Sequence, residues 1–451
     1  MGRLYSLIPV EVEPVETRYR RISTKIPVPE SIPVLERLRK YESRSMGGQP
    51  PVVWDRAEGV SVYDAYGNMW LDFSSGVLVA NAGHGNKPAV EGIRKELEKP
   101  LLHNYCFPSE IRSLAVEKLA NLSPKPLDKV FLLTTGAEAV ECAIKLARTW
   151  GGKKGKKTIV SFEGSFHGRT LGAQMAGGIP GQKEWADFAG LSVIHVPFPG
   201  EPRCPDRSFA LFESTLEKSG VSTGEVCAVI SETYQGVSAA LMPRDYAVSL
   251  RSWCDRHGAL LIFDEIQAGF GRTGRMFGFM HYGIIPDLFC LGKGISGSLP
   301  LSAVVGRPEI LDQYGPGEMT STHTGNPLSC AAFLGSIREI EENGLVENAR
   351  AMGRVFKEEL ERICGGCPLV QFLCGEGLVW GIQIGKKGTD APDPDTAFRL
   401  VERCMQKGLL FFSPVGIGGG TVKVNPPLSI TREAVLEGCG VIGEVLGEVC
   451  R

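Results

Sequence analysis

The sequence lacks the patterns that mark a membrane protein, a secreted protein or a nucleic-acid-binding protein. No apolar run approaches the roughly 18 to 20 residues of a membrane span, and the first residues, MGRLYSLIPVEVEPVETRYRR, hold no long apolar core of a secretion signal. The net charge is only −2 at pH 7, so no global field attracts nucleic acid or an anionic membrane. We therefore expect small-molecule partners, and neither a nucleic acid nor a membrane.

The cysteines follow no regular pattern. Their number, 13, is odd and they are scattered along the chain, which argues against a disulfide framework and makes a reducing cytoplasm the expected compartment. Cys364 and Cys367 form an isolated CxxC in ICGGCPL, with no second pair or histidine cluster to complete a zinc site. The simpler interpretation is a turn with two free thiols, so we expect no metal.

A chain of 451 residues is too long for one ordinary core, and its composition changes along its length. Residues 1–50, rich in Pro, Arg and Glu, are predicted to be an N-terminal arm with one short helix. Residues 51–84 alternate around the turn AYGN, which predicts a hairpin in the first part of a smaller domain. Residues 85–328 are predicted to form the large domain, and residues 329–451 the C-terminal part of the smaller α+β domain.

Short apolar segments alternate with helical segments in the large domain. They are KVFLLT, TIVSF, SVIHVP, VCAVIS, ALLIFD and LFCLG. Strands that alternate with helices predict an α/β fold with a mainly parallel sheet covered on both faces. Since ligands bind beyond the carboxyl ends of such strands, the polar residues there are the first candidates for a site: Thr134, Thr135, Glu232, Asp264 and Lys293.

Two of these strand ends carry charges that are costly to bury. The apolar run LLIF leads directly into Asp264 and Glu265, and a buried carboxylate is unfavourable unless a cation or hydrogen bonds compensate it. Lys293 follows LFCLG between two glycines, and a desolvated lysine has a depressed pKa and becomes a nucleophile able to form a Schiff base. The alternatives are solvated acids and a lysine that reaches solvent from a strand end.

The turn TTGAEA, at the start of a predicted amphipathic helix, is a candidate anion site. Gly136 allows a tight turn, and the free N–H groups of Gly136 and Ala137 could hold a phosphate, with the hydroxyl of Thr135 as a further donor. An ordinary strand-to-helix turn with a threonine cap is the alternative.

Two further segments concentrate binding groups. In SFHGRT, the ring of Phe166 offers a face for a planar ligand, His167 is either structural or part of the site, and Arg169 is either a carboxylate fork or a surface charge. In STHTGNP, hydroxyl side chains precede a helix expected to begin near Pro327, and they either cap that helix or reach a phosphate.

Seven segments together resemble the class III aminotransferases, enzymes of fold type I that use pyridoxal 5′-phosphate (PLP). The segments are GNMWLDFSSG, TTGAEAVECAIKLAR, SFHGRT, LLIFDEIQAGFGRTG, LGKGISGSLPLSA, STHTGNPLSCAA and GEGLVWGIQI, in the family's order. The resemblance covers most of the chain. It implies a PLP-dependent transferase fold, with a large PLP-binding domain built on a mainly parallel seven-stranded sheet and a smaller α+β domain.

The resemblance implies a role for most of the candidate residues. Asp264 would pair with the protonated pyridine nitrogen of PLP, and Lys293 would form the Schiff base and later move the proton between substrate and cofactor. Gln267 would bond near the ring hydroxyl, and Phe166 would stack on the ring. Glu265 has no assigned chemical role and is expected to form hydrogen bonds within the protein. The other residues implied at the cofactor are Thr135, Gly136 and Ala137 at the phosphate, Thr322 from the neighbouring subunit of a homodimer, and His167 and Glu232.

The sequence departs from the family at positions that concern the substrate. The segment ETYQG keeps Glu232 but has Thr233 where the family motif has proline, and Lys423 in GGTVKVNPPLSI stands where members that use glutamate carry arginine. Because lysine cannot form a planar bidentate fork, glutamate is doubtful as the amino donor. Arg169, Val79 and Lys423 are the expected substrate-binding residues, and Val79 would suit an aliphatic part of the substrate.

The sequence therefore predicts a PLP-dependent aminotransferase that moves an amino group from an amino acid or ω-amine to a 2-oxo acid by a ping-pong mechanism through Lys293. A racemase or epimerase on the same scaffold stays open, because it would use the same Lys293 and Asp264. A protein that kept the fold and lost the chemistry also stays open. A dehydrogenase is disfavoured, since no GxGxxG follows an early strand with an acid about 20 residues later. A homodimer is implied, and the association of two dimers stays open.

Overall fold

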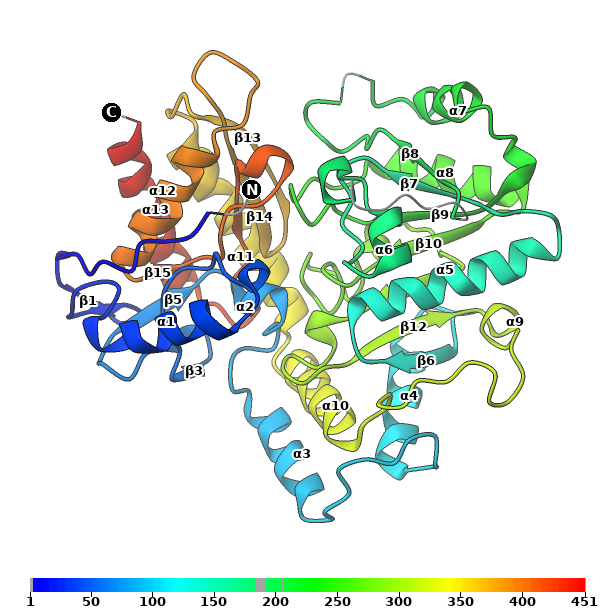
Figure 1. The fold of residues 1–451 in the computed structure, drawn as a ribbon, viewed down its shortest axis with the longest axis horizontal. Coiled ribbons are helices and arrows are strands. Elements are labelled where there is room, and N and C mark those ends of the chain that lie inside the picture. Colours follow the sequence, from blue (N-terminus) through cyan, green and yellow to red (C-terminus); the bar gives the residue numbers. More distant parts are fainter. Residues whose placement is uncertain (1–2, 184–190, 205, 451) are drawn as a thin grey trace. The chain divides into compact units, whose positions relative to one another are not determined.

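The computed structural model describes residues 3–183, 191–204 and 206–450. They fall into two compact units: the two-segment unit, within residues 1–86 and 348–451, and the large unit, within residues 87–347 (Figure 1). The expected boundary after residue 328 falls inside helix α10 (Pro327–Glu342), which packs along α3 (Lys87–Leu97) and so belongs to the large unit. No helix in the described ranges is both long and apolar enough to cross a membrane.

The large unit is built on a seven-stranded sheet in the order β6-β12-β11-β10-β9-β7-β8. Strand β12 runs antiparallel to both of its neighbours, while the other neighbouring pairs are parallel. The predicted mainly parallel sheet is therefore confirmed. The strands are β6 (Lys129–Leu133), β7 (Thr158–Phe162), β8 (Val193–Val196), β9 (Val226–Glu232), β10 (Leu260–Asp264), β11 (Leu288–Leu291) and β12 (Ser302–Gly306).

Strand β12 is the one that the apolar segments did not predict. Its sequence, SAVVG, is short and follows the Gly- and Ser-rich stretch ISGSLPL, so its local pattern resembles a loop. Its place between β6 and β11 comes from pairing with residues far away in the sequence. Such pairing is invisible to a local pattern.

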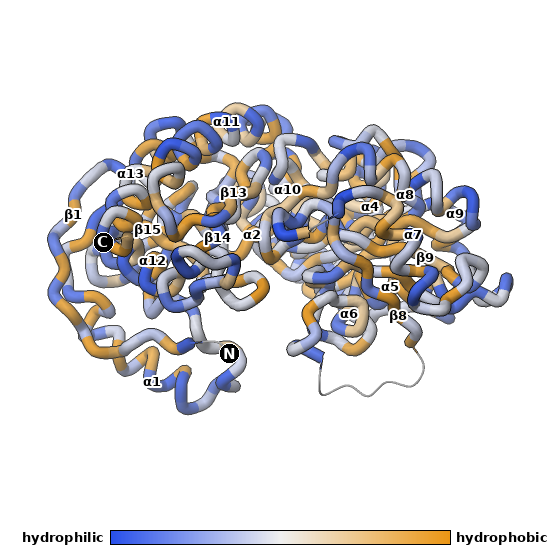
Figure 2. The backbone as a smooth tube through the Cα atoms, turned by 90° about the horizontal axis from the view of Figure 1, so that it is seen from above, coloured by the Kyte–Doolittle hydropathy of each residue, from blue (hydrophilic) through white to orange (hydrophobic). Residues whose placement is uncertain are grey.

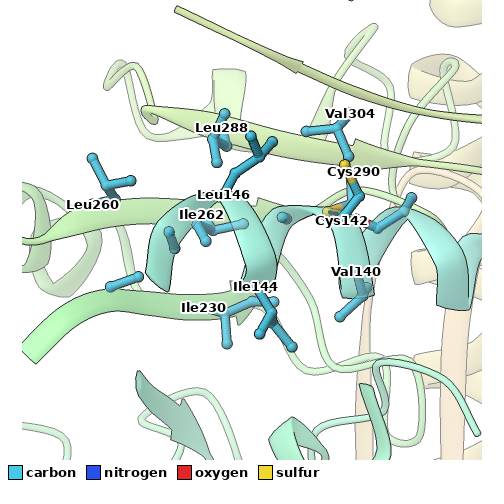
Figure 3. Packing of buried hydrophobic residues seen from close by; sticks show 14 of the residues in the cluster. Val140, Cys142, Ile144, Leu146, Ile230, Leu260, Ile262, Leu288, Cys290 and Val304 are labelled. Carbon is cyan, nitrogen blue, oxygen red and sulfur yellow. Dashed lines mark hydrogen bonds between the residues drawn. The ribbon is translucent and has the colours of Figure 1, made fainter. Parts of the chain in front are cut away.

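Helices separate most of these strands and supply the core of the large unit. Helix α5 lies against the sheet, and Figure 3 shows its side chains among those of β9, β10, β11 and β12. The labelled members are Val140, Cys142, Ile144, Leu146, Ile230, Leu260, Ile262, Leu288, Cys290 and Val304. Each large aliphatic side chain buried here contributes about 1.5–3 kcal/mol, which fixes the helix on the sheet. The remaining helices are α4 (Glu110–Leu122), α5 (Gly136–Gly152), α6 (Leu171–Ala176), α7 (Phe209–Lys218), α8 (Arg244–His257) and α9 (Pro308–Leu311).

The two-segment unit contains two sheets. One has the order β1-β2-β5-β4-β3 with β15 pairing β5, and the predicted hairpin is its β4–β5 pair. The other is antiparallel, in the order β13-β14-β16. The strands are β1 (Val15–Glu16), β2 (Arg21–Ile22), β3 (Arg56–Glu58), β4 (Ser61–Tyr63), β5 (Met69–Asp72), β13 (Val370–Glu376), β14 (Val379–Ile384), β15 (Leu409–Leu410) and β16 (Thr421–Val424).

The helices of this unit are amphipathic except for the short α2 (Ser75–Leu78), and Figure 2 shows this for α11 (Leu345–Cys364), along which hydrophilic and hydrophobic colours alternate. They are α1 (Ile32–Tyr41), α2 (Ser75–Leu78), α11 (Leu345–Cys364), α12 (Pro394–Gln406) and α13 (Arg432–Val449). The N-terminal arm belongs to the same unit, because the buried ring of Tyr5 stacks on Phe398 of α12 with ring centroids 4.2 Å apart.

The expectation of free thiols in the CxxC turn is wrong for Cys367. The turn itself forms, with the N–H of Cys367 donating to the carbonyl of Cys364 at 3.0 Å. However, Cys367 forms a disulfide with Cys450, just after α13. The two cysteines are 83 positions apart, so only the tertiary fold brings them together.

Candidate active site

The predicted strand-end residues meet at one edge of the large sheet. Strands β9 and β10 end at Glu232 and Asp264, and Lys293 follows the end of β11. The chain order reverses between β7 and β9, because β8 lies on one side of β7 and β9 on the other. Ligands of open α/β sheets bind at such a reversal, outside the carboxyl ends of the strands. This edge is therefore the candidate active site.

Asp264 is buried and paired. Its Oδ2 accepts a hydrogen bond from Nδ1 of His167 at 2.7 Å, and its Oδ1 accepts one from the N–H of Ile266 at 3.0 Å. Burial lowers the pKa of His167, but the hydrogen bond and negative charge of Asp264 outweigh it, so the net pKa shift is upward. The hydrogen bond from His167 therefore fixes the direction of the Asp264 carboxylate inside the protein.

Glu232 lies beside this pair. Its two carboxylate oxygens accept bonds from the backbone N–H groups of Phe166 at 3.1 Å and Gly236 at 2.8 Å. Burial raises the pKa of Glu232 to about 7, while the nearby charge of His167 acts in the opposite direction. Glu232 is thus close to its titration point at neutral pH, a property that clusters in active sites.

Lys293 follows β11 in a strained conformation. Its φ of +47° lies in the left-handed region, which a residue with a side chain adopts only when its surroundings hold it there. Burial lowers the pKa of its ammonium group, and attraction to Asp264 and Glu232 offsets only part of this effect. The amine therefore loses its proton more readily than an exposed lysine does, as a nucleophile or general base requires.

The first turn of α5 lies close to the end of β11. A Cβ built on Gly292 would lie 3.4 Å from the Cα of Gly136, and one on Gly136 would lie 2.9 Å from the side chain of Ile266. Glycine at position 136 allows this close approach. Thr135 is the N-cap of α5, and its hydroxyl accepts the N–H of Glu138 at 3.3 Å within a capping box. The threonine cap considered as the alternative is therefore present.

Gln267 carries a sign of a missing partner. Its Oε1 is buried and has no hydrogen-bond partner within the described part of the chain. Its side-chain amide lies against Gly236, where an added Cβ would come within 2.1 Å of Nε2. A buried acceptor without a partner is costly and rare in native proteins. This atom therefore indicates a place for a ligand that donates a hydrogen bond.

Glu265 is held by the protein, as expected. Its Oε1 accepts hydrogen bonds from the hydroxyl of Thr233 and from the N–H of Phe279 at 3.0 Å, and its Oε2 accepts one from the N–H of Gly278 at 2.6 Å. The side chain is fully buried. The two adjacent carboxylates at the end of β10 are thus compensated separately, one by an imidazole and the other by neutral donors.

The other predicted residues do not all join this cluster. The guanidinium carbon of Arg169 lies 5.4 Å from the ring centroid of Phe166. Arg169 and Thr322 are exposed residues of the large unit. Val79 is half-buried and Lys423 is fully buried in β16, and both belong to the two-segment unit. The substrate and cofactor roles of these residues stay predictions.

Two features of this region were not predicted from the sequence and are seen only in the structure. Helix α10 is capped by Asn326, whose Oδ1 accepts the N–H of Leu328 at 2.9 Å, and not by the hydroxyls before it. The sequence also left out Gly236, whose N–H holds Glu232. The sequence feature that could have identified Gly236 is its place as the last residue of ETYQG, shortly after Glu232.

The chain is similar to known proteins that are named as aminotransferases. The family model described as "Aminotransferase class-III" matches residues 43–446. The chain is 31% identical over 446 residues to the 4-aminobutyrate aminotransferase of Mycobacterium leprae (strain TN), covering 95% of this chain and 98% of the relative. It is 34% identical over 406 residues to the acetylornithine aminotransferase of Caldanaerobacter subterraneus subsp. tengcongensis, covering 88% of this chain and 95% of the relative. A solved aminotransferase from Bacillus anthracis superimposes with a TM-score of 0.84 at 29% identity, covering 94% of this chain and 100% of that one.

These similarities decide between the alternatives left open by the motifs. The relatives are named for amino-group transfer, which does not favour the racemase or epimerase. The match extends over nearly the whole chain and includes the strand-end cluster. The chain belongs to the class III aminotransferases, and it is a PLP-dependent aminotransferase of fold type I.

Proposed function

We propose that this enzyme moves an amino group from an amino acid or ω-amino compound to a 2-oxo acid, with PLP bound at the strand ends of the large unit. The observation that carries this proposal is the environment of Lys293. Its amine is buried near two carboxylates, Asp264 and Glu232, and burial lowers its pKa. A lysine so placed serves as nucleophile and base rather than as a structural charge.

The described residues fit this cofactor. The Oε1 of Gln267, which has no hydrogen-bond partner among the described residues, needs a donor, and the ring hydroxyl of PLP is one. Asp264, oriented by His167, offers a buried carboxylate for the ring nitrogen. The groups proposed for the rest of the cofactor are the N–H groups of Gly136 and Ala137 with the Thr135 hydroxyl for the phosphate, and the ring of Phe166 for stacking. When bound, PLP supplies an aldehyde that joins covalently to amines and a ring that withdraws electrons.

Three side chains divide the chemical work. The amine of Lys293 would hold the cofactor, and once the donor is bound it would take the proton from the donor carbon that carries the amino group. Its lowered pKa keeps a larger fraction of the amine free to accept that proton. Asp264 would hold a proton on the ring nitrogen of the bound cofactor, and His167 orients Asp264 by donating from Nδ1.

The proposed substrate residues are Arg169, Val79 and Lys423. Lys423 occupies the position where glutamate-using members of the family carry arginine, and a single ammonium group cannot make the bidentate contact of a guanidinium with a carboxylate. We therefore propose that glutamate is a poor donor. Donors related to those in the names of the relatives, 4-aminobutyrate and acetylornithine, are proposed to react faster.

A panel of donors tests this function. The holoenzyme is incubated with 4-aminobutyrate, N-acetylornithine or glutamate against pyruvate or 2-oxoglutarate, and the amino acid formed is measured. We expect transfer from an ω-amino donor, with kcat/KM for glutamate lower by about tenfold, the equivalent of one charge-assisted hydrogen bond. No transfer from any donor would contradict the proposal. Loss of optical activity from a single L-amino acid without an acceptor would indicate a racemase instead.

We also propose a homodimer, on the basis of an exposed apolar surface. The segment between α3 and α4 exposes Leu101, Leu102, Tyr105 and Phe107, of which Phe107 is 73% exposed. The hydroxyl of Tyr105 donates to Oγ1 of Thr320 at 3.2 Å, so this surface adjoins the segment that carries Thr322. A second copy of the chain would cover these side chains, and Thr322 would then lie at the subunit interface.

Phe107→Asp should weaken this dimer. The variant loses a buried ring and places a charge in the interface, so the dimer dissociation constant should rise by about 100-fold or more. Sedimentation at several protein concentrations measures it and shows whether two dimers associate. Tyr41→Asp is the control, since Tyr41 is 75% exposed on α1 of the other unit. A monomeric wild type would refute the dimer.

The proposed compartment is the cytoplasm. Eleven of the 13 cysteines are free thiols, as is usual where glutathione keeps thiols reduced. The Cys367–Cys450 disulfide is uncommon in that compartment. Cell fractionation followed by an activity assay of each fraction tests the location.

A further inference from the structure

Thr233 follows β9 directly, where ETYQG departs from the proline-containing motif it resembles. The residue is 1% exposed, and its hydroxyl donates to Oε1 of Glu265. Its carbonyl accepts bonds from the hydroxyl of Tyr282 at 2.6 Å and from the N–H of Met242 at 3.1 Å. Proline has no hydroxyl to donate, so the contact with Glu265 is a property of this chain and not of the motif.

Three hydrogen-bond donors favour the charged form of Glu265, and burial opposes it. The hydroxyl of Thr233 and the N–H groups of Gly278 and Phe279 all donate to its carboxylate, and a charged carboxylate accepts all three bonds. Burial and the charge of Asp264 oppose that form, and the pKa of Glu265 is raised to about 7 although the three donors lower it. Each donor therefore matters for the charge of Glu265 near neutral pH.

The two tyrosines around Glu265 do not titrate in its place, whereas Glu232, whose pKa is also raised to about 7, titrates in the same range. The groups that interact with it are Asp264 on the same strand, Tyr234 after β9 and Tyr282 after the single turn Gly278–His281. The pKa values of both tyrosines are raised well above the usual range by burial, so both are neutral at pH 7. The fully buried Arg272 acts as a positive charge on Tyr234.

Glu265 also lies within the backbone that carries the proposed cofactor contacts. Its N–H donates to the carbonyl of Cys290 on β11 at 2.9 Å, and its carbonyl accepts the N–H of Gly269 at 2.8 Å. Its side chain adds a tie to Thr233 at the end of β9. The packing there is close, since a Cβ on Gly278 would lie 2.9 Å from Oγ1 of Thr233. Movement of the Glu265 side chain therefore displaces its neighbours in the chain.

We propose that Thr233 is a positioning residue for the cofactor site: its hydroxyl holds the carboxylate of Glu265 and thereby keeps Asp264 and Gln267 in place for PLP. This inference rests on the proposed function, because it concerns the same site. Without the hydroxyl, Glu265 takes up a proton at a higher pH, since a donor that favoured its charged form is gone. A protonated Glu265 accepts fewer hydrogen bonds, so the proposed tie that positions Asp264 and Gln267 is lost at a pH at which the wild type still has it.

Three substitutions test the role of the hydroxyl. Thr233→Val removes it and keeps the shape, Thr233→Pro introduces the motif residue, and Thr233→Ser keeps a hydroxyl. PLP affinity of the apoenzyme is titrated across the pH range. One hydrogen bond to a charged group is worth a factor of about ten in an equilibrium constant, which is about one pKa unit. The acid limb, meaning the pH range in which PLP affinity falls as the pH is lowered, should therefore lie about one pH unit higher in Thr233→Val and Thr233→Pro. It should be unchanged in Thr233→Ser. Thr215→Val, which removes a hydroxyl bonded to Leu211 within α7, is the matched control.

Thermal unfolding of the apoenzyme gives a second measurement that does not depend on activity. The folded pKa of Glu265, about 7, lies above its ordinary value of 4.5, so this group makes stability fall as pH rises through that interval. In Thr233→Val the folded pKa is higher still, and the fall continues to a higher pH. The variant should therefore match the wild type below the interval and unfold at lower temperature above it.

The outcomes are distinguishable. Equal pH profiles for folded Thr233→Val and wild type would overturn the inference and leave the proposed function standing. A loss of affinity that is the same at every pH and is not rescued by Thr233→Ser would show a packing role and would also overturn it. If Thr233→Val does not fold, Glu265→Gln decides: the part of the pH dependence that comes from Glu265 must be lost while the part that comes from Glu232 stays, and an unchanged pH profile would overturn the inference. A wild type that neither binds PLP nor transfers amino groups would refute the proposed function instead.

Discussion

Lys293→Met should abolish amino transfer and the visible absorption of the bound cofactor. Methionine keeps an unbranched stem but has no amine, so it can neither hold the aldehyde of PLP nor take the proton from the donor carbon. Positioned acid–base catalysis alone contributes about 100- to 10,000-fold, and covalent attachment adds to it, so kcat/KM should fall by about 10,000-fold or more. An assay of amino transfer and an absorbance spectrum measure the two effects.

The matched control is Lys156→Met, at another buried lysine of the large unit. The amine of Lys156 donates to the carbonyl of His257 and lies outside the strand-end cluster. This variant should keep its activity per folded molecule. Reduction of the holoenzyme with borohydride followed by peptide mapping should find the cofactor on the peptide that contains Lys293. A cofactor attached to a different lysine would disprove the assignment.

Asp264→Asn should leave the protein folded and reduce kcat/KM strongly. The amide cannot stabilise a proton on the ring nitrogen, and it also removes the charge that raises the pKa of His167, so burial then keeps that imidazole neutral. A hydrogen bond to a charged group is worth about 1.5–3 kcal/mol, which corresponds to roughly a 10- to 160-fold fall in kcat/KM. Steady-state kinetics with the preferred donor, together with the affinity for PLP, measures the loss.

Asp287→Asn separates this effect from a general loss of stability. Asp287, which precedes β11, is also a buried aspartate; its carboxylate bonds Arg251 and Arg307, each at 2.8 Å, and the N–H of Leu261 at 2.7 Å. Asp287→Asn should lower the unfolding temperature and keep kcat per folded molecule. If Asp264→Asn behaved in the same way, Asp264 would be a structural residue and not part of the catalytic site.

The strand-end residues could be predicted because their signals are local. An apolar run that ends in an acid or a lysine can be recognised from a few consecutive residues. Because the carboxyl ends of parallel strands meet at one edge of a sheet, such residues are expected to lie close together. Asp264, Glu232 and Lys293 were found in this way, and their mutual influence in the fold agrees with it. The environment that tunes them was not predictable, since His167 reaches Asp264 across 97 positions of the sequence.

The same contrast holds for the elements. Strands β6 to β11 contain enough consecutive apolar residues to be recognised, whereas β12 is a strand because β6 and β11 pair with it. The disulfide of Cys367 and the hydroxyl bond of Thr233 likewise depend on partners distant in the sequence. A motif comparison identifies Thr233 only as a departure from proline and says nothing of what its hydroxyl does.

The sequence by itself determined the α/β class, the family and the side chains with the chemistry to act, because hydrophobic periodicity and strand-end polarity are properties of neighbouring residues. The tertiary structure alone decided that His167 pairs with Asp264, that the buried Oε1 of Gln267 has no partner within the described residues, and that Thr233 is one of the donors to Glu265. The physical reason is that pKa values and hydrogen bonds depend on burial and on distances of a few ångströms between segments that the chain brings together only by folding.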